Sequence, residues 1–247
     1  ALLALGNGDG TFAEAKPVYA LSGHGLPLFA DLVGDGAIDL VVPRGGFNEV
    51  SVYQGDGLGG FSSVLTLALT APPQTLQLAD VDGDLAPDLV VTAQIGQTQS
   101  LLIAWGKAQG GFEPFVSQSL STLFGQTAEA TRELQVADVN DDGADDLLFV
   151  APKSASLVFG SDTRTPAFSA RFDARAKASG GARSDLDEDG NVDLVLTNMD
   201  DSLLTIRYGA GNGSFGAAVE YTAGNNVSKI RVGDVDADGD LDLVFSA

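Results

Sequence analysis

The stretch DVDADGDLDLVF, residues 234–245, places five aspartates at alternate positions and follows them directly with an apolar run. Carboxylates at this density repel one another, so the stretch needs a positive charge among them in order to fold. Related stretches begin at Asp31, Asp80, Asp138 and Asp185, and successive starts lie 47 to 58 residues apart. The aspartate stretch is therefore one copy of an internal repeat, and a repeat of this period decides the fold class.

A second motif alternates with the first. It consists of an apolar or aromatic residue, a glycine, a polar turn and a phenylalanine, and its copies end at Phe12, Phe61, Phe112, Phe168 and Phe215. Four copies place the phenylalanine six residues after the glycine, whereas the copy that begins at Gly160 takes eight and lacks the middle glycines. Five copies of each motif in 247 residues give a unit of about 49 residues, which suits a four-stranded propeller blade.

Each unit is predicted to contain four short strands. In the unit around Asp80 they are TLQLADV (75–81), DLVVTA (88–93), SLLIAW (100–105) and FEPFVSQSL (112–120). Each is rich in Val, Leu or Phe and is bounded by Gly, Asp or Pro. The best helical candidate in the chain is Leu123–Leu134, between two units.

The two ends of the chain complement each other. Residues 1–6 and 13–21 supply the third and fourth strands of a unit, and residues 229–235 and 242–247 supply the first and second. The sequence therefore predicts an all-β chain with a single domain over 1–247. This domain is a β-propeller of about five four-stranded blades, closed by pairing the N-terminal strands with the C-terminal strands in one blade, because closure removes exposed sheet edges. The alternative is a fragment of a longer, seven-bladed ring.

The aspartate stretches have the pattern of metal-binding loops. Positions one, three, five and nine carry Asp or Asn, and position six is usually Gly; the four complete sets are Asp80, Asp82, Asp84 and Asp88; Asp138, Asn140, Asp142 and Asp146; Asp185, Asp187, Asp189 and Asp193; and Asp234, Asp236, Asp238 and Asp242. Hard oxygen ligands in a tight loop suit Ca²⁺ better than Mg²⁺, which demands a stricter octahedron and keeps its waters. A metal-free, Asp-rich surface turn is the alternative for a single copy, but four copies with one pattern favour metal.

Two copies depart from the pattern. Leu85 replaces the turn glycine in the second copy, which predicts local strain. Val33 stands at position three of the first copy and leaves Asp31, Asp35 and Asp39, so this loop is expected to bind weakly or not at all. The expected cofactor is therefore Ca²⁺, with about four ions and a fifth in doubt. An EF-hand is excluded, because position twelve is apolar instead of Glu and a β-type run follows.

The composition excludes several classes of function. Thirteen Lys and Arg against 34 Asp and Glu leave a net charge of −21, which disfavours nucleic acid and anionic membranes. There is no cysteine for thiolate chemistry, and the single histidine, His24, has no distinctive catalytic partner. The sequence also lacks the GxSxG, HExxH and P-loop motifs. No catalytic residue, no enzymatic activity and no membrane insertion are expected.

The aspartate segments D-x-D-x-D-G-x-x-D-L-V, together with the turns G-x-G-x-G-x-F, resemble FG-GAP/VCBS repeats, the blades of integrin-α-like β-propellers. The resemblance spans the whole chain. It implies that the aspartate loop joins the first two strands of a blade and binds Ca²⁺, and that ligands engage the opposite face or the rim. It also implies a bacterial protein that is secreted or on the cell surface, often attached to other domains of a larger protein.

The face opposite the aspartate loops is therefore the expected place for a protein or glycan ligand, because loops on a rigid scaffold carry recognition. Several of the few cations fall in the connections expected there: Arg44, Arg132, Lys153, Arg175, Lys177 and Arg183. Phe47 and Phe124 are candidate exposed anchors, although burial is at least as common for Phe. The predicted function is an extracellular, calcium-binding adhesion or protein-interaction module; a lectin-like glycan binder is the alternative, and a glycan-active enzyme or its accessory domain is a weaker one.

Overall fold

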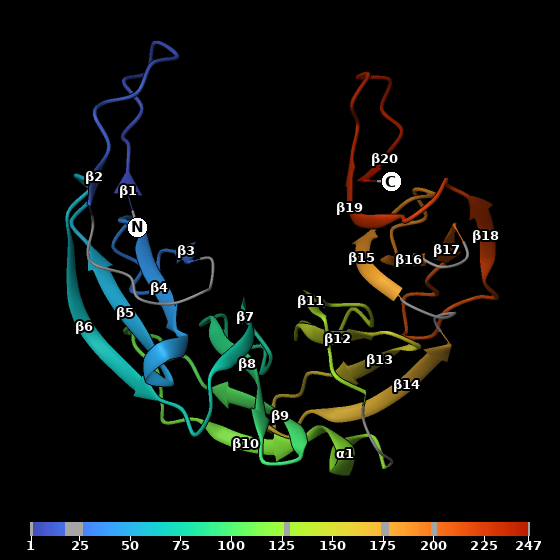
Figure 1. Cartoon of the computed structure of the whole chain (residues 1–247), viewed down its shortest axis with the longest axis horizontal. Coiled ribbons are helices and arrows are strands. Elements are labelled where there is room, and N and C mark those ends of the chain that lie inside the picture. The colour runs from blue at the N-terminus through green and yellow to red at the C-terminus, as the bar shows by residue number, and fades with distance from the viewer. Residues whose placement is uncertain (1, 18–26, 126–128, 174–177, 199–201, 247) are drawn as a thin grey trace. The chain divides into compact units, whose positions relative to one another are not determined.

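The computed structural model describes residues 2–17, 27–125, 129–173, 178–198 and 202–246. Within these ranges almost all of the regular secondary structure is antiparallel β-strand (Figure 1). The exceptions are a one-turn α-helix, α1 (Leu120–Leu123), and a short 3-10 helix, η1 (Gly45–Phe47). The expected all-β class is thus confirmed for the described residues.

Sixteen of the strands form four sheets of four, and in each sheet the strands lie in chain order. The sheets consist of β3 (Leu28–Ala30), β4 (Asp39–Arg44), β5 (Glu49–Gly55) and β6 (Phe61–Ala68); β7 (Pro73–Ala79), β8 (Asp88–Ile95), β9 (Thr98–Ala104) and β10 (Val116–Ser119); β11 (Glu133–Ala137), β12 (Asp146–Ala151), β13 (Ser154–Phe159) and β14 (Ala167–Asp173); and β15 (Ala178–Ser184), β16 (Asp193–Asn198), β17 (Leu203–Arg207) and β18 (Val219–Thr222).

Two further sheets have two strands each. β1 (Leu2–Leu3) pairs with β2 (Lys16–Pro17), and β19 (Ser228–Gly233) pairs with β20 (Asp242–Ser246). By their place in the repeat, β1 and β2 are third and fourth strands, and β19 and β20 are first and second strands. The structure therefore confirms the four-stranded unit and shows a two-stranded sheet at each end of the chain; that these two sheets belong to one unit stays a prediction.

The second strand of each complete sheet is deeply buried. All six residues of β12 and of β16 are buried, as are the first five of β4 and the first six of β8. A strand that is covered on both faces needs apolar residues at every position, which explains why DLVV and DLLF show no alternation.

The chain divides into two compact units, one of Ala1–Leu78 with Ala86–Ser117, and one of Ala79–Leu85 with Gln118–Ala247. A core of the first unit contains Val41 of β4 and Leu89 of β8, both fully buried. Among the described residues of the second unit, apolar clusters form around Leu148 and Leu196 and around Val195 and Ile230. A single domain over 1–247 stays a prediction.

The helix predicted over Leu123–Leu134 is wrong in the described part of that segment. α1 ends at Leu123, the first residue of the predicted helix, and β11 begins at Glu133. Leu134 instead pairs with Phe149 in β12.

Of the two phenylalanines considered as exposed anchors, Phe124 is buried and Phe47 is exposed. The Phe124 ring packs against Phe149 and Phe168, at centroid distances of 5.6 and 5.5 Å.

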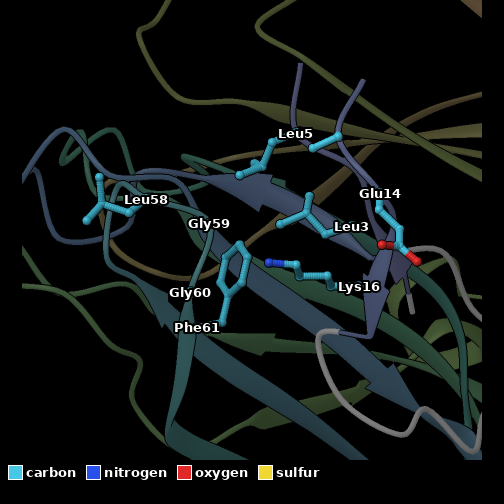
Figure 2. Close-up of a pocket in the computed structure, with 9 residues that line it drawn as sticks. Leu3, Leu5, Glu14, Lys16, Leu58, Gly59, Gly60 and Phe61 are labelled. Atoms are coloured by element: carbon cyan, nitrogen blue, oxygen red, sulfur yellow. The ribbon is translucent and has the colours of Figure 1, made fainter. Parts of the chain in front are cut away.

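In the first unit, the β1–β2 sheet lies beside the turn between β5 and β6. A cavity of about 350 Å³ lies there, lined on its apolar side by Leu3, Leu5, Leu58 and Phe61, with Glu14 and Lys16 at the same cavity (Figure 2). Gly59 allows this approach, because a Cβ at this position would lie 3.0 Å from Leu5.

Candidate metal centre

All five aspartate loops occupy the same place in their sheets. Each connects the first strand to the second, as between β3 and β4, β15 and β16, or β19 and β20. The connection between the third and fourth strands lies at the same end of a sheet, because the strands are antiparallel. Both sequence motifs therefore meet at one end of each four-stranded sheet.

The aspartate at position one holds the loop closed through its two carboxylate oxygens. In the loop that begins at Asp185, Oδ1 accepts the amide of Asp189 at 3.1 Å and Oδ2 accepts that of Gly190 at 2.9 Å. Asp31, Asp80, Asp138 and Asp234 accept from positions five and six in the same way. This explains why position one is Asp in every copy.

The loop also requires a left-handed backbone at position six. The glycines there have φ of 82° (Gly36), 87° (Gly143), 90° (Gly190) and 101° (Gly239), and Leu85 adopts φ 69° in the remaining copy. L-residues with a side chain are strained in this region, so the strain predicted at Leu85 is present in the structure.

Replacing Leu85 with glycine is expected to stabilise the protein by about 0.5–1 kcal/mol. The relief of the left-handed strain, about 1–2 kcal/mol, exceeds the entropic cost of a glycine, and the Leu85 side chain is 88% exposed and contributes little packing. Thermal unfolding in EDTA should show a melting temperature a few degrees higher. Leu58→Gly is the matched control, because Leu58 is 83% exposed but does not adopt a positive φ; an equal gain there would contradict the explanation.

The aspartate at position nine joins the two motifs. In the fourth sheet the buried Asp193 accepts the amide of Leu186 on Oδ2 at 2.8 Å and the amide of Gly209 on Oδ1 at 2.8 Å. Asp39 and Asp146 bind the corresponding amides in their own sheets, and Asp88 accepts the amide of Gly106. In each four-stranded sheet, the glycine that opens the second motif is thus hydrogen-bonded to the aspartate at position nine of the first.

The close contact between the end of the third strand and the end of the aspartate loop also explains why the residue there is glycine. A Cβ on Gly209 would lie 2.2 Å from the carbonyl oxygen of Val192, the residue before Asp193. A Cβ on Gly55, Gly106 or Gly160 would lie 2.2, 2.5 or 2.6 Å from the equivalent carbonyl oxygen, which belongs to Ile38, Pro87 or Asp145, respectively. No side chain fits at these distances.

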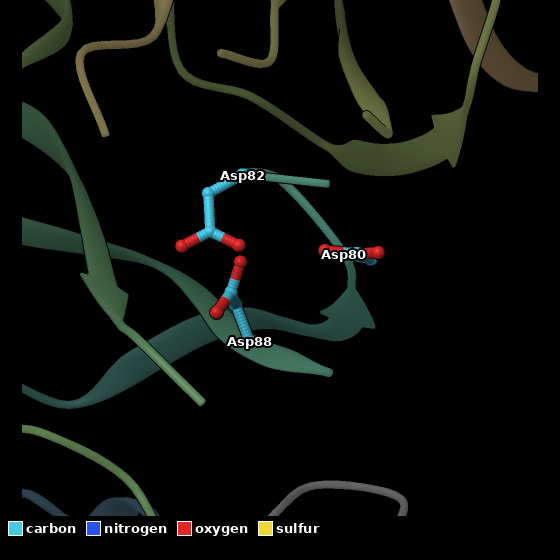
Figure 3. A group of neighbouring side chains, drawn as sticks. All are labelled: Asp80, Asp82 and Asp88. Carbon is cyan, nitrogen blue, oxygen red and sulfur yellow. The ribbon is translucent and has the colours of Figure 1, made fainter. Parts of the chain in front are cut away.

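Three of the loops bring carboxylate oxygens close enough to share one ion. The oxygens of positions one, three and nine lie within 4.8 Å of one another in the groups Asp80, Asp82 and Asp88; Asp185, Asp187 and Asp193; and Asp234, Asp236 and Asp242. Figure 3 shows the first group, in which the carboxylates of Asp82 and Asp88 point toward each other. Two ligands on opposite sides of a Ca²⁺ ion lie about 5 Å apart, so these donor sets fit that ion.

The other predicted ligands do not belong to these three carboxylate groups. The acids at position five lie outside the three groups; Asp189 and Asp238 each accept the amide two residues further on, at 2.8 and 2.9 Å. In the third loop, position three is Asn140, whose side-chain amide donates to Asp142 at 3.0 Å. Asp31, Asp35 and Asp39 of the first loop do not form such a group, as expected from Val33. The ligand roles themselves stay predictions.

The pKa shifts also differ between the Asp185 loop and the first loop. Desolvation, followed by the carboxylates of Asp189 and Asp193, raises the pKa of Asp187. In the first loop, by contrast, hydrogen bonds from backbone amides, that of Gly36 foremost, lower the pKa of Asp31. Asp187 thus resists ionisation, and a bound cation would relieve this resistance.

Burial also raises the pKa of Asp146 to about 6, although the amides of Val139 and Gly160 oppose the shift. In the metal-free protein the protonated form of Asp146 therefore favours folding. That contribution is complete below the ordinary value near 3.8 and is lost as the pH rises through about 6.

The opposite end of the sheets carries Arg44, Phe47 and Lys153 of the predicted ligand-binding residues. The prediction is wrong for Arg183 of β15, which pairs with Leu194 next to the pair of Ser184 and Asp193 and so lies at the aspartate-loop end. The Arg44 guanidinium lies 4.4 Å from the ring centroid of Phe47 and 2.6 Å from Glu49, and Phe47 is 56% exposed. The Lys153 side chain is exposed in the turn between β12 and β13. Arg175, Lys177 and His24 lie outside the described residues.

No helix in the described part of the chain is long and apolar enough to cross a membrane. The sequence pattern of the FG-GAP-like repeat matches the chain three times, at residues 31–91, 80–149 and 185–245. No curated protein matches the sequence significantly.

Among solved structures, the chain resembles BBS1N from a complex with ARL6DN, with a TM-score of 0.57 at 13% identity over 84% of this chain and 60% of that one. It also resembles the periplasmic gluconolactonase PpgL of Pseudomonas aeruginosa, with a TM-score of 0.57 at 14% identity over 100% of this chain and 66% of that one. At these identities the likeness concerns the propeller fold alone. The chain spans about three fifths of the length of the BBS1N structures.

Proposed function

The chain belongs to the FG-GAP-like repeat family, and on that premise we propose that it is an extracellular, calcium-binding β-propeller that serves as an adhesion or protein-interaction module. The observation that carries this proposal is the grouping of three carboxylates within 4.8 Å in the loops that begin at Asp80, Asp185 and Asp234. We further propose that the chain is part of a larger bacterial protein that is secreted or on the cell surface.

Ca²⁺ would supply the positive charge that the crowded carboxylates lack. The residues at positions one, three and nine would hold it through side-chain oxygens, and Asn140 would contribute its amide oxygen in the third loop. The bonds from position one to the loop amides, and from position nine to the strand-three glycine, already orient these carboxylates. The loops are thus arranged to stabilise the ends of the sheets, while the opposite ends remain available for a ligand.

We propose that β20 and β1 pair, so that the two-stranded sheets complete a fifth blade and close the ring. In four sheets the aspartate at position nine accepts the amide of the strand-three glycine. In the divided unit, the corresponding residues are Asp242, whose Oδ2 accepts the amide of Val235 at 3.0 Å, and Gly6. The repeat pattern therefore assigns the Gly6 amide to the remaining oxygen of Asp242.

This closure predicts the effect of two glycine substitutions. Gly209→Ala should cost about 1–3 kcal/mol, because its Cβ would overlap the Val192 carbonyl oxygen. In a closed ring Gly6→Ala should cost as much, although the nearest atom to its Cβ within the N-terminal sheet is 4.0 Å away, on Phe12. Chemical unfolding measures both, with Gly216→Ala as control, since its Cβ would meet nothing nearer than 3.6 Å. A Gly6→Ala variant as stable as Gly216→Ala would contradict closure and favour a longer ring.

A lectin-like glycan binder is the second candidate, and Phe47 is the observation that favours it. An exposed ring beside a charged pair, Arg44 and Glu49, offers an apolar face and polar groups together. Sugars present the same combination of C–H faces and hydroxyl groups, so a ring and adjacent polar groups suit them.

A glycan array and a cell-binding assay in Ca²⁺ and in EDTA test both candidates. A lectin should bind glycans, lose this binding with Phe47→Ala and retain it with Phe12→Ala, which removes an even more exposed ring near the aspartate-loop end. A protein-interaction module should bind intact cells in a way that protease treatment of the cells abolishes. Absence of both kinds of binding in Ca²⁺ would refute the proposed role.

A further inference from the structure

Two of the departures from the repeat pattern lie together in the second compact unit. One is the aspartate loop in which Leu85 replaces the turn glycine, and the other is the long turn between β13 and β14 that begins at Gly160. The amide of Ser161 donates to the carbonyl oxygen of Val81 at 2.8 Å and fixes this turn against the loop. Residues that are irregular in the sequence are therefore neighbours in the structure.

The turn places a guanidinium on the acids of the loop. Arg164 Nε lies 2.6 Å from Asp82 Oδ2, and Arg164 Nη2 lies 3.4 Å from Asp84 Oδ2. The Asp82 side chain is only 3% exposed, whereas that of Arg164 is 36% exposed. The shorter contact is thus an ion pair with a buried carboxylate, whose loss would leave that charge uncompensated.

The next loop of the same unit receives the same kind of turn without a cation. There the amide of Gly213 donates to the carbonyl oxygen of Val139 at 3.0 Å, as Ser161 does to Val81. The turn is the regular one of YGAGNGSF, with Asn212 and Gly213 at its tip. The contact between turn and loop is therefore common to both places, and the arginine is particular to the Asp80 loop.

We infer that Arg164 supplies at Asp82 and Asp84 the positive charge that Ca²⁺ would supply in the other aspartate loops, so that the Asp80 loop binds Ca²⁺ weakest of the four complete sets. A Ca²⁺ ion at this loop would have to take Asp82 from the guanidinium and then lie next to it, and the two cations repel. The inference rests on the proposed calcium binding of the other loops, and it reduces the expected tight ions from four to three.

Counting bound Ca²⁺ by equilibrium dialysis of the full chain tests the inference. The wild-type chain should bind three ions tightly, and Arg164→Gln should bind a fourth. Lys153→Gln is the matched control, because it removes one positive charge from the same sheet at the turn between β12 and β13; it should leave the count at three. Arg164→Lys keeps the charge, and it too should leave the count at three.

A second pair of variants does not depend on the stability of Arg164→Gln. Asp187→Asn, at position three of the Asp185 loop, should reduce the wild-type count by one, whereas Asp82→Asn at the same position should leave it unchanged. Equal losses in the two variants, or equal counts in wild-type and folded Arg164→Gln chains, would overturn the inference.

The melting temperature in EDTA separates this inference from the proposed function. Without Ca²⁺, Arg164→Gln should lower it by about 3–6 °C and Lys153→Gln should not. A wild-type chain that binds no Ca²⁺ would refute the proposed function, while the EDTA measurement would still report on the Arg164 ion pair. No loss of stability in EDTA would refute the role of Arg164 itself.

Discussion

In saturating Ca²⁺ the protein is expected to melt about 15–30 °C above its melting temperature in EDTA. An ion present at a hundred times its dissociation constant adds about 2.7 kcal/mol to the stability of the folded state, so three ions add about 8 kcal/mol. For a chain of 247 residues each kcal/mol corresponds to about 2–4 °C. The physical reason is the crowding of carboxylates in the loops, where desolvation and neighbouring acids raise the pKa of Asp187.

Scanning calorimetry in Ca²⁺, in Mg²⁺ and in EDTA at equal ionic strength measures this effect and separates it from screening. Salt alone weakens the repulsion within a net charge of −21, so the EDTA sample must contain the same ionic strength. A double variant, Asp187→Asn with Asp236→Asn, should lose most of the response to Ca²⁺ because it weakens two loops. Equal melting temperatures in Ca²⁺ and EDTA would contradict the proposed Ca²⁺ binding. Equal melting temperatures in Ca²⁺ and Mg²⁺ would contradict a site that selects ions of the size of Ca²⁺.

The strands were predictable because burial acts on each repeat in the same way. The second strand is covered on both faces, so runs such as DLVV and DLLF recur directly after each aspartate stretch and mark β4, β8, β12 and β16. The recurring loop pattern predicted ligands at positions one, three, five and nine; the structure groups positions one, three and nine in three loops and leaves position five outside. The departures at Val33 and Leu85 were visible for the same reason.

Long-range contacts were not predictable from the pattern. Leu134 has a helix-forming side chain, but pairing with Phe149 in β12 outweighs this local preference. The contact of Arg164 with Asp82 joins positions 82 residues apart, and no local signal in either segment points to the other. The hydrogen bond from the Gly209 amide to Asp193 was predictable only in part. Both residues were singled out by their motifs, but only the hairpin of β16 and β17 shows that one binds the other.

Asp193→Ala is expected to cost about 3–5 kcal/mol of stability even in EDTA. The substitution removes the acceptor for two amides, those of Leu186 and Gly209, each bonded at 2.8 Å. Each buried amide left without an acceptor costs about 1–3 kcal/mol, and the bonds lost are charge-assisted. Urea unfolding in EDTA measures this cost without any contribution from a bound ion.

Two further variants distinguish the loss of these two hydrogen bonds from a general effect of losing an acid. Asp193→Asn keeps one carbonyl oxygen as acceptor and should lose about half as much stability. Asp189→Ala removes an exposed acid from the same loop that accepts a single amide, that of Asn191, so its loss should be about 1 kcal/mol. If Asp193→Ala in EDTA were no less stable than Asp189→Ala, the aspartate at position nine would act only through a metal. The recurrence of glycine at the end of the third strand would then have to follow from the carbonyl contact alone.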